Sequence, residues 1–529
     1  MEGDRQAPGE RLGWAGALLA LVIAVALFSR YGIDATLVRD ESIYAYGGQQ
    51  LADGVPFYAS IFDAKTPLAS QLAGLGVVAA DAVGANDLDA IRIVFFVCSC
   101  LAVVAVYVLG LWLWRSAVAG LVAAVTFAAF RGFAMDALGG PNAKTPGVLF
   151  AVVSMALVVR RRWFWAAFTG SLAFLVWQPL GIYAALAVVL AVLSADAGRR
   201  MSSFGRAFAG ASIPIGATTL YFWLAGALPE MAEAAFRFPV TGLHRAPKTL
   251  TERIDHIVGT VHKGYGNSAI LFWAGLILLV ALVVVRLVRA RSDLRVVVSD
   301  PALGVVLPSL LVLVAFSIAD FEGYSDVYPG LPYAALGLGG AVGLAIDRLR
   351  PRARRVATAG ALVAVAALAG LAWSWYSADG ADNAGLVAQR ADASTIERML
   401  DPGETLYALG DPAPLVLTGR RNPSRFIYLT SGVGQWVVAH TSGGFPTWVR
   451  GILASDPAVI VVHGWRSSLR KRTERWLRKR YERVYMGDWH VLVRPDVRAR
   501  AARRGIILRG PPGAGRIDAP LQGRPRTRR

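Results

Sequence analysis

The sequence predicts a polytopic α-helical membrane protein with a soluble α/β domain at its carboxyl end. Apolar residues make up 55% of the 529 positions, which is above the 45–50% typical of soluble domains. This apolar excess falls before Tyr376, where long hydrophobic runs alternate with short loops that contain arginine. After Tyr376 the chain becomes more polar, and its hydrophobic runs shorten to strand length. We therefore expect a membrane domain over residues 1–376 followed by a soluble domain.

Eleven apolar stretches are expected to span the membrane, although several fall short of the roughly 20 residues that a crossing requires. They are Leu12–Phe28, Ile91–Trp114, Ala117–Phe130, Pro146–Val159, Trp163–Trp177, Leu180–Leu193, Phe204–Leu224, Ala269–Val285, Ala302–Ile318, Tyr328–Ile346 and Val356–Trp375. The run Pro67–Val83 is also apolar, but Ser70, Gln71 and Asp81 interrupt it. We expect this run to form a helix that lies at the membrane surface without crossing.

The positive-inside rule gives the orientation. Five short loops of the membrane domain are basic: Trp114-Arg115, Arg160–Arg162, Arg199-Arg200, Arg286–Arg295 and Arg348–Arg355. Such loops face the cytoplasm, and all five do so only if Pro67–Val83 does not cross. The prediction is a multi-pass plasma-membrane protein with a cytoplasmic amino terminus and an extracytoplasmic carboxyl domain. The first outer loop then covers residues 31–89, and three further polar segments share its face: Arg131–Thr145, Pro229–Ser268 and Ala319–Asp326.

The soluble domain is expected over residues 377–495 as a mixture of strands and helices. Strands are predicted at Thr405–Leu409, Leu415–Leu417, Val459–Val462, Val484–Tyr485 and Val491–Val493, and helices at Ala388–Leu400, Thr447–Ala454 and Ser467–Lys479. Residues 496–529 are rich in Arg, Gly and Pro and are expected to be a basic disordered tail. The last 64 residues contain 20 Lys/Arg and 5 Asp/Glu. No stacking-aromatic motif accompanies this charge, so nucleic acid is not an expected partner.

Two neighbouring carboxylates, Asp40 and Glu41, follow the first hydrophobic span, with Arg39 directly before them. Acidic residues close to a bilayer are costly and are functional candidates by default. A cation next to Asp40 helps to keep that carboxylate ionised. The alternative is structural: Asp40 caps a helix that begins near Glu41, since Asp is a favourable N-cap residue.

The order of motifs resembles the GT-C glycosyltransferases, in particular bacterial enzymes similar to protein mannosyltransferases and lipid A aminoarabinose transferase. The resemblance is carried by the segments Asp40–Gln49, Gly54–Tyr58, Asp63–Leu68 and Ala90–Ile93. It is best over residues 31–145. Two positions depart from the family pattern, because Ala64 replaces the usual His before the lysine and Thr66-Pro67 replaces Pro-Pro.

This resemblance implies transfer of a sugar from a polyprenyl-phosphate donor to an envelope glycan, lipid or protein on the outer face, among membrane lipids. It makes Asp40 the catalytic base of an inverting reaction, with Glu41 or Asp136 in reserve, and it gives the donor phosphate to Lys65, Arg237 or Arg245. The candidate substrate-binding residues are Glu41, Asp63, Lys65, Arg131, Asp136, Arg237, Arg245 and Tyr324.

The cofactor requirement and the protein class stay open at this point. A divalent metal could be bound by His244, His256 and His262, although their spacing fits no metal signature. A transporter or flippase would place ionisable groups near the membrane midplane, whereas the predicted spans are almost free of charge. That difference favours an enzyme, and a non-catalytic scaffold for envelope assembly is the third alternative.

Overall fold

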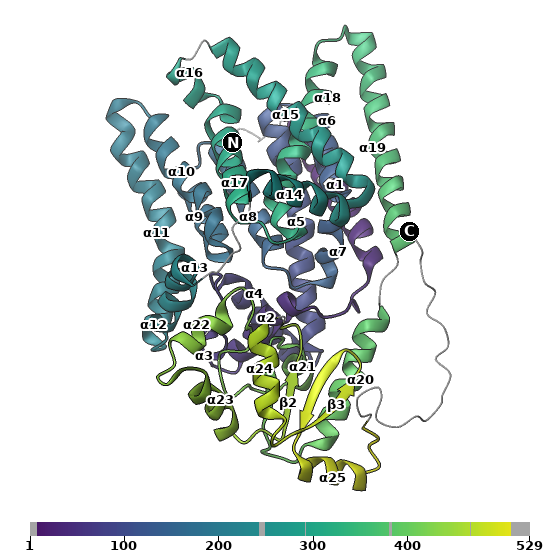
Figure 1. The fold of residues 1–529 in the computed structure, drawn as a ribbon. Coiled ribbons are helices and arrows are strands. Elements are labelled where there is room, and N and C mark those ends of the chain that lie inside the picture. Colours follow the sequence, from purple (N-terminus) through teal and green to yellow (C-terminus); the bar gives the residue numbers. More distant parts are fainter. Residues whose placement is uncertain (1–7, 243–248, 291–292, 380–382, 466, 509–529) are drawn as a thin grey trace.

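The computed structural model describes residues 8–242, 249–290, 293–379, 383–465 and 467–508. They form a bundle of long helices with a smaller α/β domain at one end (Figure 1). Each of the eleven predicted spans coincides with a bundle helix. These helices are α1 (Pro8–Phe28), α5 (Asp87–Trp114), α6 (Ala117–Ala128), α8 (Lys144–Val159), α9 (Trp163–Val176), α10 (Ile182–Leu193), α11 (Arg200–Leu224), α15 (Ala269–Ala290), α17 (Leu307–Ala319), α18 (Leu331–Asp347) and α19 (Pro351–Asp379).

Helix length supports a multi-pass membrane protein. Within the described residues, seven helical stretches are long and apolar enough to cross a membrane. An eighth arises if α6 and α7 (Arg131–Gly139), which meet at 70°, form one broken span. Helices α8, α9 and α10 are apolar but shorter, so the number of eleven crossings stays a prediction.

Small residues bring the bundle helices into close contact. A Cβ atom added at Gly275 of α15 would lie 2.1 Å from the carbonyl oxygen of Ala334 in α18, and one at Gly337 would lie 2.0 Å from the carbonyl of Gly275. Helices α5 and α6 approach in the same way at Gly110 and Gly120. In lipid, where no hydrophobic effect drives helices together, such close backbone packing is a main source of association.

Short helices occupy the end of the bundle that carries the α/β domain. They are α2 (Arg39–Ala52), α3 (Phe57–Ser60), α4 (Leu68–Val83), α7, α12 (Leu228–Met231), the π-helix η4 (Ala232–Arg237), α13 (Phe238–Thr241), α14 (Leu250–Tyr265) and the 3-10 helix η7 (Tyr324–Gly330). The connections are η1 (Ser29–Tyr31), η2 (Gln178–Gly181), η3 (Ala197–Arg199), η5 (Gly266–Ser268), α16 (Leu294–Ser299) and the π-helix η6 (Ala302–Val306). The predicted surface helix is α4. It packs closely against α2, because a Cβ at Gly48 would lie 2.6 Å from that of Ala73, while Leu75 and Val78 are exposed.

The carboxyl domain contains a four-stranded sheet in the order β1-β2-β4-β3. Strands β1 and β2 are parallel, with Leu406 opposite Val459, and β4 runs antiparallel to both β2 and β3. Its elements are α20 (Asn383–Met399), β1 (Leu406–Leu409), α21 (Ala413–Thr418), α22 (Val433–Ala439), α23 (Gly444–Ala454), β2 (Val459–Val462), α24 (Ser468–Leu477), β3 (Glu482–Met486), β4 (Trp489–Val493) and α25 (Pro495–Arg503). Every residue of β1 and β2 is buried, as expected for strands covered on both faces.

Two sequence predictions for this domain are wrong. Residues Leu415–Leu417 belong to helix α21, whose end is fixed by Gly419 in the left-handed region at φ 62°. A short apolar run fits a buried helix as well as a strand, so periodicity could not separate them. The disordered tail does not begin at Asp496, because α25 continues to Arg503 and is held by ion pairs of Arg498 with Glu482 and of Arg500 with Glu404. Residues 509–529 lie outside the described residues.

The α/β domain docks directly on α2, which lies between it and the bundle (Figure 1). Ser42 Oγ donates to the buried carboxylate of Asp411 over 2.7 Å, and the backbone amide of Asn422 donates to the hydroxyl of Tyr46 over 3.0 Å. The backbone amide of Phe62 donates to the carbonyl of Arg425 over 2.8 Å. The first loop is thus held between the helix bundle and the α/β domain.

Cysteine labelling should reveal the orientation of these two ends. Ala59 and Ser442 are exposed at the domain end and Ser202 is exposed at the start of α11, while the native Cys98 and Cys100 are buried. We expect Ala59→Cys and Ser442→Cys to react with a membrane-impermeant thiol reagent in intact cells, and Ser202→Cys to react only after permeabilisation. The reverse pattern would invert the predicted topology.

Candidate active site

A cavity of about 580 Å³ lies where α2, the helix bundle and the α/β domain meet. Five groups of residues from the membrane domain line it: Arg39, Asp40 and Ile43; Asp63–Lys65; Lys144 with Trp177–Pro179; Ala235, Phe236 and Phe238–Val240; and Phe316, Asp320, Glu322, Gly323, Ser325 and Asp326. The α/β domain adds Tyr428, Ser431 and Val433. Segments nearly 400 residues apart in the sequence therefore line the same cavity.

Asp40 projects into this cavity from the first turn of α2. Helix α2 begins at Arg39 with Val38 as its N-cap residue, so Asp40 is the second helical residue and the predicted capping role is wrong. The Val38 amide is instead satisfied by Glu41 Oε2 at 3.4 Å. The carboxylate of Asp40 accepts a hydrogen bond from Arg39 Nε at 3.2 Å, and its side chain is 56% accessible. Asp40 is therefore free to contact a molecule in the cavity.

Arg39 is held by the α/β domain. Its Nη1 donates to the carbonyl oxygen of Gly464 over 3.0 Å, and its guanidinium lies 5.0 Å from the ring centroid of Tyr428. Both partners come from the carboxyl domain, whereas Asp40 belongs to the membrane domain. The docked domain thus fixes the cation that pairs with Asp40.

The environment separates the pKa values of the two adjacent carboxylates. Burial alone would raise the pKa of Asp40, but the Lys65 ammonium and the Arg39 guanidinium lower it below its ordinary value. Glu41 is buried, and burial together with repulsion from Asp136 raises the pKa of its carboxyl well above the ordinary value. Opposite shifts in neighbouring acids identify the group that stays ionised and can accept a proton. Here that group is Asp40.

Lys65 places a second charge in the cavity. Its Nζ donates to the Tyr44 hydroxyl over 2.6 Å, and its carbonyl accepts from the Tyr58 hydroxyl over 2.7 Å. Burial alone would lower the pKa of Lys65, but its interaction with Tyr44 and the negative charges of Asp63 and Asp40 raise it well above the ordinary value, so the ammonium stays protonated. Burial raises the pKa of Asp63, whose Oδ2 has no hydrogen-bond partner among the described residues. Lys65 forms no ion pair within 4 Å in the described part of the chain, and its charge is available to a ligand.

A second lysine, Lys144, lines the same cavity and was missed by the sequence interpretation. Its Nζ pairs with Asp326, donates to Ser325 Oγ over 3.3 Å and lies 5.1 Å from the ring centroid of Trp177. The sequence did contain a signal. The tetrapeptide Ala-Lys-Thr-Pro occurs at residues 64–67 and again at residues 143–146, each time at the start of an apolar helix.

Three other predicted residues form a buried network beside the cavity lining. Asp136 accepts hydrogen bonds from the hydroxyls of Tyr324 (2.9 Å) and Tyr328 (2.6 Å) and from Asn142 Nδ2 (2.7 Å). Glu41 is buried and electrostatically coupled to Asp136. With three donors bound, Asp136 has little capacity left for a substrate hydroxyl.

The remaining predicted residues lie elsewhere. Arg131 donates to the carbonyl of Gly264 at the end of α14, and Arg237 lies 5.8 Å from the ring centroid of Trp436. Neither residue lines the cavity. Arg245 and His244 lie outside the described residues. Within the described ranges no group of three His, Cys, Asp or Glu side chains could hold a metal, and His256 packs against the ring of Phe321.

Arg92 of helix α5 anchors the first loop to the helix bundle. This side chain of α5 is fully buried, and it donates from Nε to the carbonyl of Gly140 (2.9 Å), from Nη2 to that of Ala35 (2.7 Å) and from Nη1 to that of Ile33. One guanidinium thereby joins the chain before α2 to the loop after α7. It also satisfies three backbone acceptors, of which Gly140 is buried and Ile33 and Ala35 are partly buried.

Comparisons with known proteins agree with this architecture. No protein-family model matches the sequence, and no curated protein matches it. The structure is similar to that of ArnT from Cupriavidus metallidurans in the apo state, with a TM-score of 0.59 and 16% identity over 91% of this chain and 97% of that chain. For the same protein bound to undecaprenyl phosphate the TM-score is 0.61 at 16% identity, over 91% and 98% of the chains. The Archaeoglobus fulgidus oligosaccharyltransferase, tethered to an acceptor peptide, gives 0.50 at 15% identity over 85% of this chain and 68% of that chain.

These proteins are members of the GT-C superfamily. The chain therefore has the GT-C fold, and the resemblance predicted from the sequence is confirmed for the fold. The low sequence identity, 15–16%, leaves activity and substrates to the residues of the cavity.

Replacing Arg92 should destabilise the protein. Arg92→Met removes the donors of three buried or partly buried carbonyl groups, and each buried unsatisfied group costs about 1–3 kcal/mol. We expect a loss of about 3 kcal/mol or more, measured as a lower melting temperature of the purified protein in detergent. Arg206→Met, at an exposed position of α11, serves as the control. Equal melting temperatures for both variants would contradict the anchoring role.

Proposed function

We propose that the protein is a membrane glycosyltransferase that transfers a sugar from a polyprenyl-phosphate donor to an acceptor of the cell envelope. The observation that carries this proposal is the presence, in one cavity, of an ionised carboxylate, Asp40, and of Lys65, a lysine without an ion-pair partner among the described residues. A base and a phosphate-binding cation are the two groups that sugar transfer from a glycosyl phosphate requires.

A lipid-linked donor is supported by the character of the cavity wall. Phe236 and Val240 line the cavity and are 44% and 84% exposed. They form an apolar edge through which a polyprenyl chain can extend into lipid while its phosphate stays at the polar centre. ArnT from Cupriavidus metallidurans, whose fold this chain shares, has been observed with undecaprenyl phosphate bound.

In the proposed reaction Asp40 accepts the proton of an acceptor hydroxyl. The hydroxyl oxygen forms a bond to the anomeric carbon of the donor sugar, and the bond from that carbon to the phosphate oxygen breaks. Polyprenyl phosphate leaves with the bonding electron pair, and attack opposite to the leaving group inverts the anomeric configuration. The cavity cations stabilise the charge that develops on the phosphate.

The geometry favours Lys65 over Lys144 as the phosphate ligand. The charge of Lys144 is already neutralised by Asp326, whereas within the described residues the Lys65 ammonium donates only to the neutral hydroxyl of Tyr44. We assign Lys144 to holding the loop around Asp326 in place. The acceptor is an envelope glycan, lipid or protein that enters next to Tyr428 and Ser431 of the α/β domain. The proposed reaction takes place on the extracytoplasmic side of the plasma membrane, where the positive-inside rule predicts the α/β domain.

Asp40→Asn tests the catalytic assignment. Asparagine retains the shape of the side chain but cannot accept a proton from a hydroxyl, and general-base catalysis contributes about 10²–10⁴-fold. We expect transfer from radiolabelled polyprenyl-phosphate sugars to fall by two orders of magnitude or more, with expression and melting temperature nearly unchanged. Glu41→Gln is the matched control and should retain more activity. Near-normal turnover of Asp40→Asn would refute the base role.

Lys65→Met should alter both donor binding and the pH profile. A hydrogen bond to a charged group contributes about 1.5–3 kcal/mol, so we expect kcat/KM for the donor to fall about 10- to 100-fold, largely through KM. Because the Lys65 ammonium lowers the pKa of Asp40, its removal raises that pKa, and the acidic limb of the kcat/KM profile should move to higher pH. Lys65→Arg keeps the charge and should leave the limb in place. An unchanged KM and an unchanged limb in Lys65→Met would contradict the assignment.

A further inference from the structure

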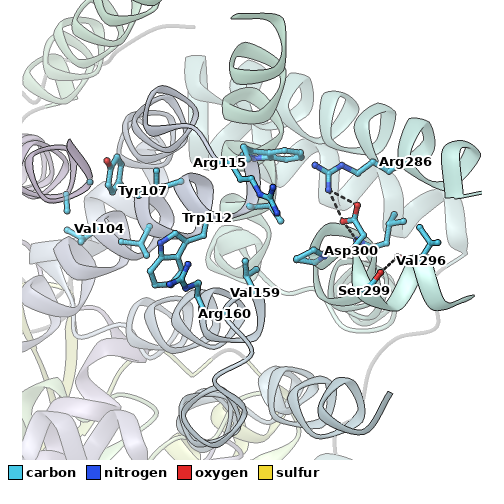
Figure 2. A pocket seen from close by; sticks show the side chains of 18 of the residues that line it. Val104, Tyr107, Trp112, Arg115, Val159, Arg160, Arg286, Val296, Ser299 and Asp300 are labelled. Atoms are coloured by element: carbon cyan, nitrogen blue, oxygen red, sulfur yellow. Dashed lines mark hydrogen bonds and ion pairs between the residues drawn. The ribbon is translucent and has the colours of Figure 1, made fainter. Parts of the chain in front are cut away.

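A second and larger cavity, of about 1,220 Å³, lies at the opposite end of the bundle from Asp40. It is enclosed by α1, the carboxyl ends of α5, α8 and α15, and the segment formed by α16 and η6 (Figure 2). The proposed sugar transfer does not involve this cavity. Its lining differs from a plain helix crevice in two respects: its charges and its open side.

The cavity has an excess of arginine. Arg115, Arg160, Arg286 and Arg289 line it from three helix ends. Arg286 is neutralised by both carboxylate oxygens of Asp300, at 2.8 and 2.9 Å. The other three form no ion pair with any acidic residue in the described part of the chain, and they are exposed. Three positive charges therefore remain uncompensated around one cavity.

Aromatic rings hold two of the guanidinium groups in this cavity. Arg160 lies 5.2 Å from the ring centroid of Trp112, and Arg286 lies 4.9 Å from that of Trp114.

The wall formed by α1 and α5 is apolar. Val104, Val108 and Leu111 line it, and Trp14 of α1 also lines the cavity while 74% of its surface is exposed. Trp side chains are enriched at the level of lipid head groups. The ligand can therefore reach the arginines laterally from the bilayer and leave hydrocarbon chains against the apolar wall.

We infer that this cavity binds the phosphate head group of an anionic membrane lipid in the leaflet opposite to Asp40. Arg115, Arg160 and Arg289 supply charge-assisted hydrogen bonds to the phosphate oxygens. Basic residues near a membrane surface attract anionic lipids in general, so the specific element of the site is the convergence of these three arginines around one cavity with an apolar wall.

Native mass spectrometry of the purified full-length protein in detergent tests this inference. Phosphatidylglycerol, phosphatidylcholine and inorganic phosphate are titrated separately onto three proteins: the wild type, the double variant Arg115→Gln/Arg160→Gln, and the double variant Arg348→Gln/Arg352→Gln. The two double variants have lost the same number of arginines. Arg348 follows α18 and Arg352 lies in the first turn of α19; both are exposed and neither lines the cavity.

We expect the wild type and the Arg348/Arg352 variant to retain one tightly bound phosphatidylglycerol that phosphatidylcholine does not replace. The Arg115/Arg160 variant should bind it at least about ten-fold more weakly, since each basic residue near the surface contributes about five-fold. Equal losses in both double variants would show general charge attraction and refute a built site. Inorganic phosphate that competes for the site as strongly as the lipid would refute the lipid assignment.

Discussion

A polar helix can be buried beside a membrane bundle only if another part of the protein satisfies its hydrogen-bonding groups. Helix α2 has this problem, because ten consecutive residues from Glu41 to Gln50 are buried. The α/β domain provides the solution: Asp411 accepts from Ser42, the Val416 carbonyl accepts from Gln49, and the Asn422 amide donates to Tyr46. Docking of this domain is thus a condition for the conformation of the first loop, and Asp40 is positioned by both.

The same docking determines the electrostatics of the cavity. Arg39 can pair with Asp40 because Gly464 and Tyr428 hold its guanidinium on the opposite side. One residue further along α2, Glu41 faces the apolar interior and Asp136, and the pKa shifts of the two acids have opposite signs. Two carboxylates that are adjacent in sequence are therefore chemically different. Their burial and their neighbours produce this difference, because an isolated Asp and an isolated Glu have almost the same pKa.

The two ends of the bundle share a principle of construction. In each, cations are held against aromatic rings: Lys144 against Trp177 at the domain end, and Arg160 against Trp112 at the other. At each end some cations are paired with a neighbouring acid: Arg39 with Asp40 and Lys144 with Asp326 at the domain end, and Arg286 with Asp300 at the other. Among the described residues, Lys65 at the domain end and three arginines at the other end form no such pair, so their charges are available to anions.

The sequence by itself determined the positions of the helices and the location of the main candidate acid. Hydropathy marked all eleven bundle helices, because transfer from water to lipid depends on local composition. The position of Asp40 beside a span and next to Arg39 identified it for the same local reason. The sequence interpretation missed Lys144 and the contribution of Tyr428 and Ser431 to the cavity. It also did not show that Arg131 and Arg237 lie outside the cavity lining. These features arise from contacts between segments up to several hundred residues apart, which only the tertiary structure decides. Helix α25 beyond the predicted domain boundary has the same origin: its arginines meet Glu482 and Glu404 only after the sheet has formed.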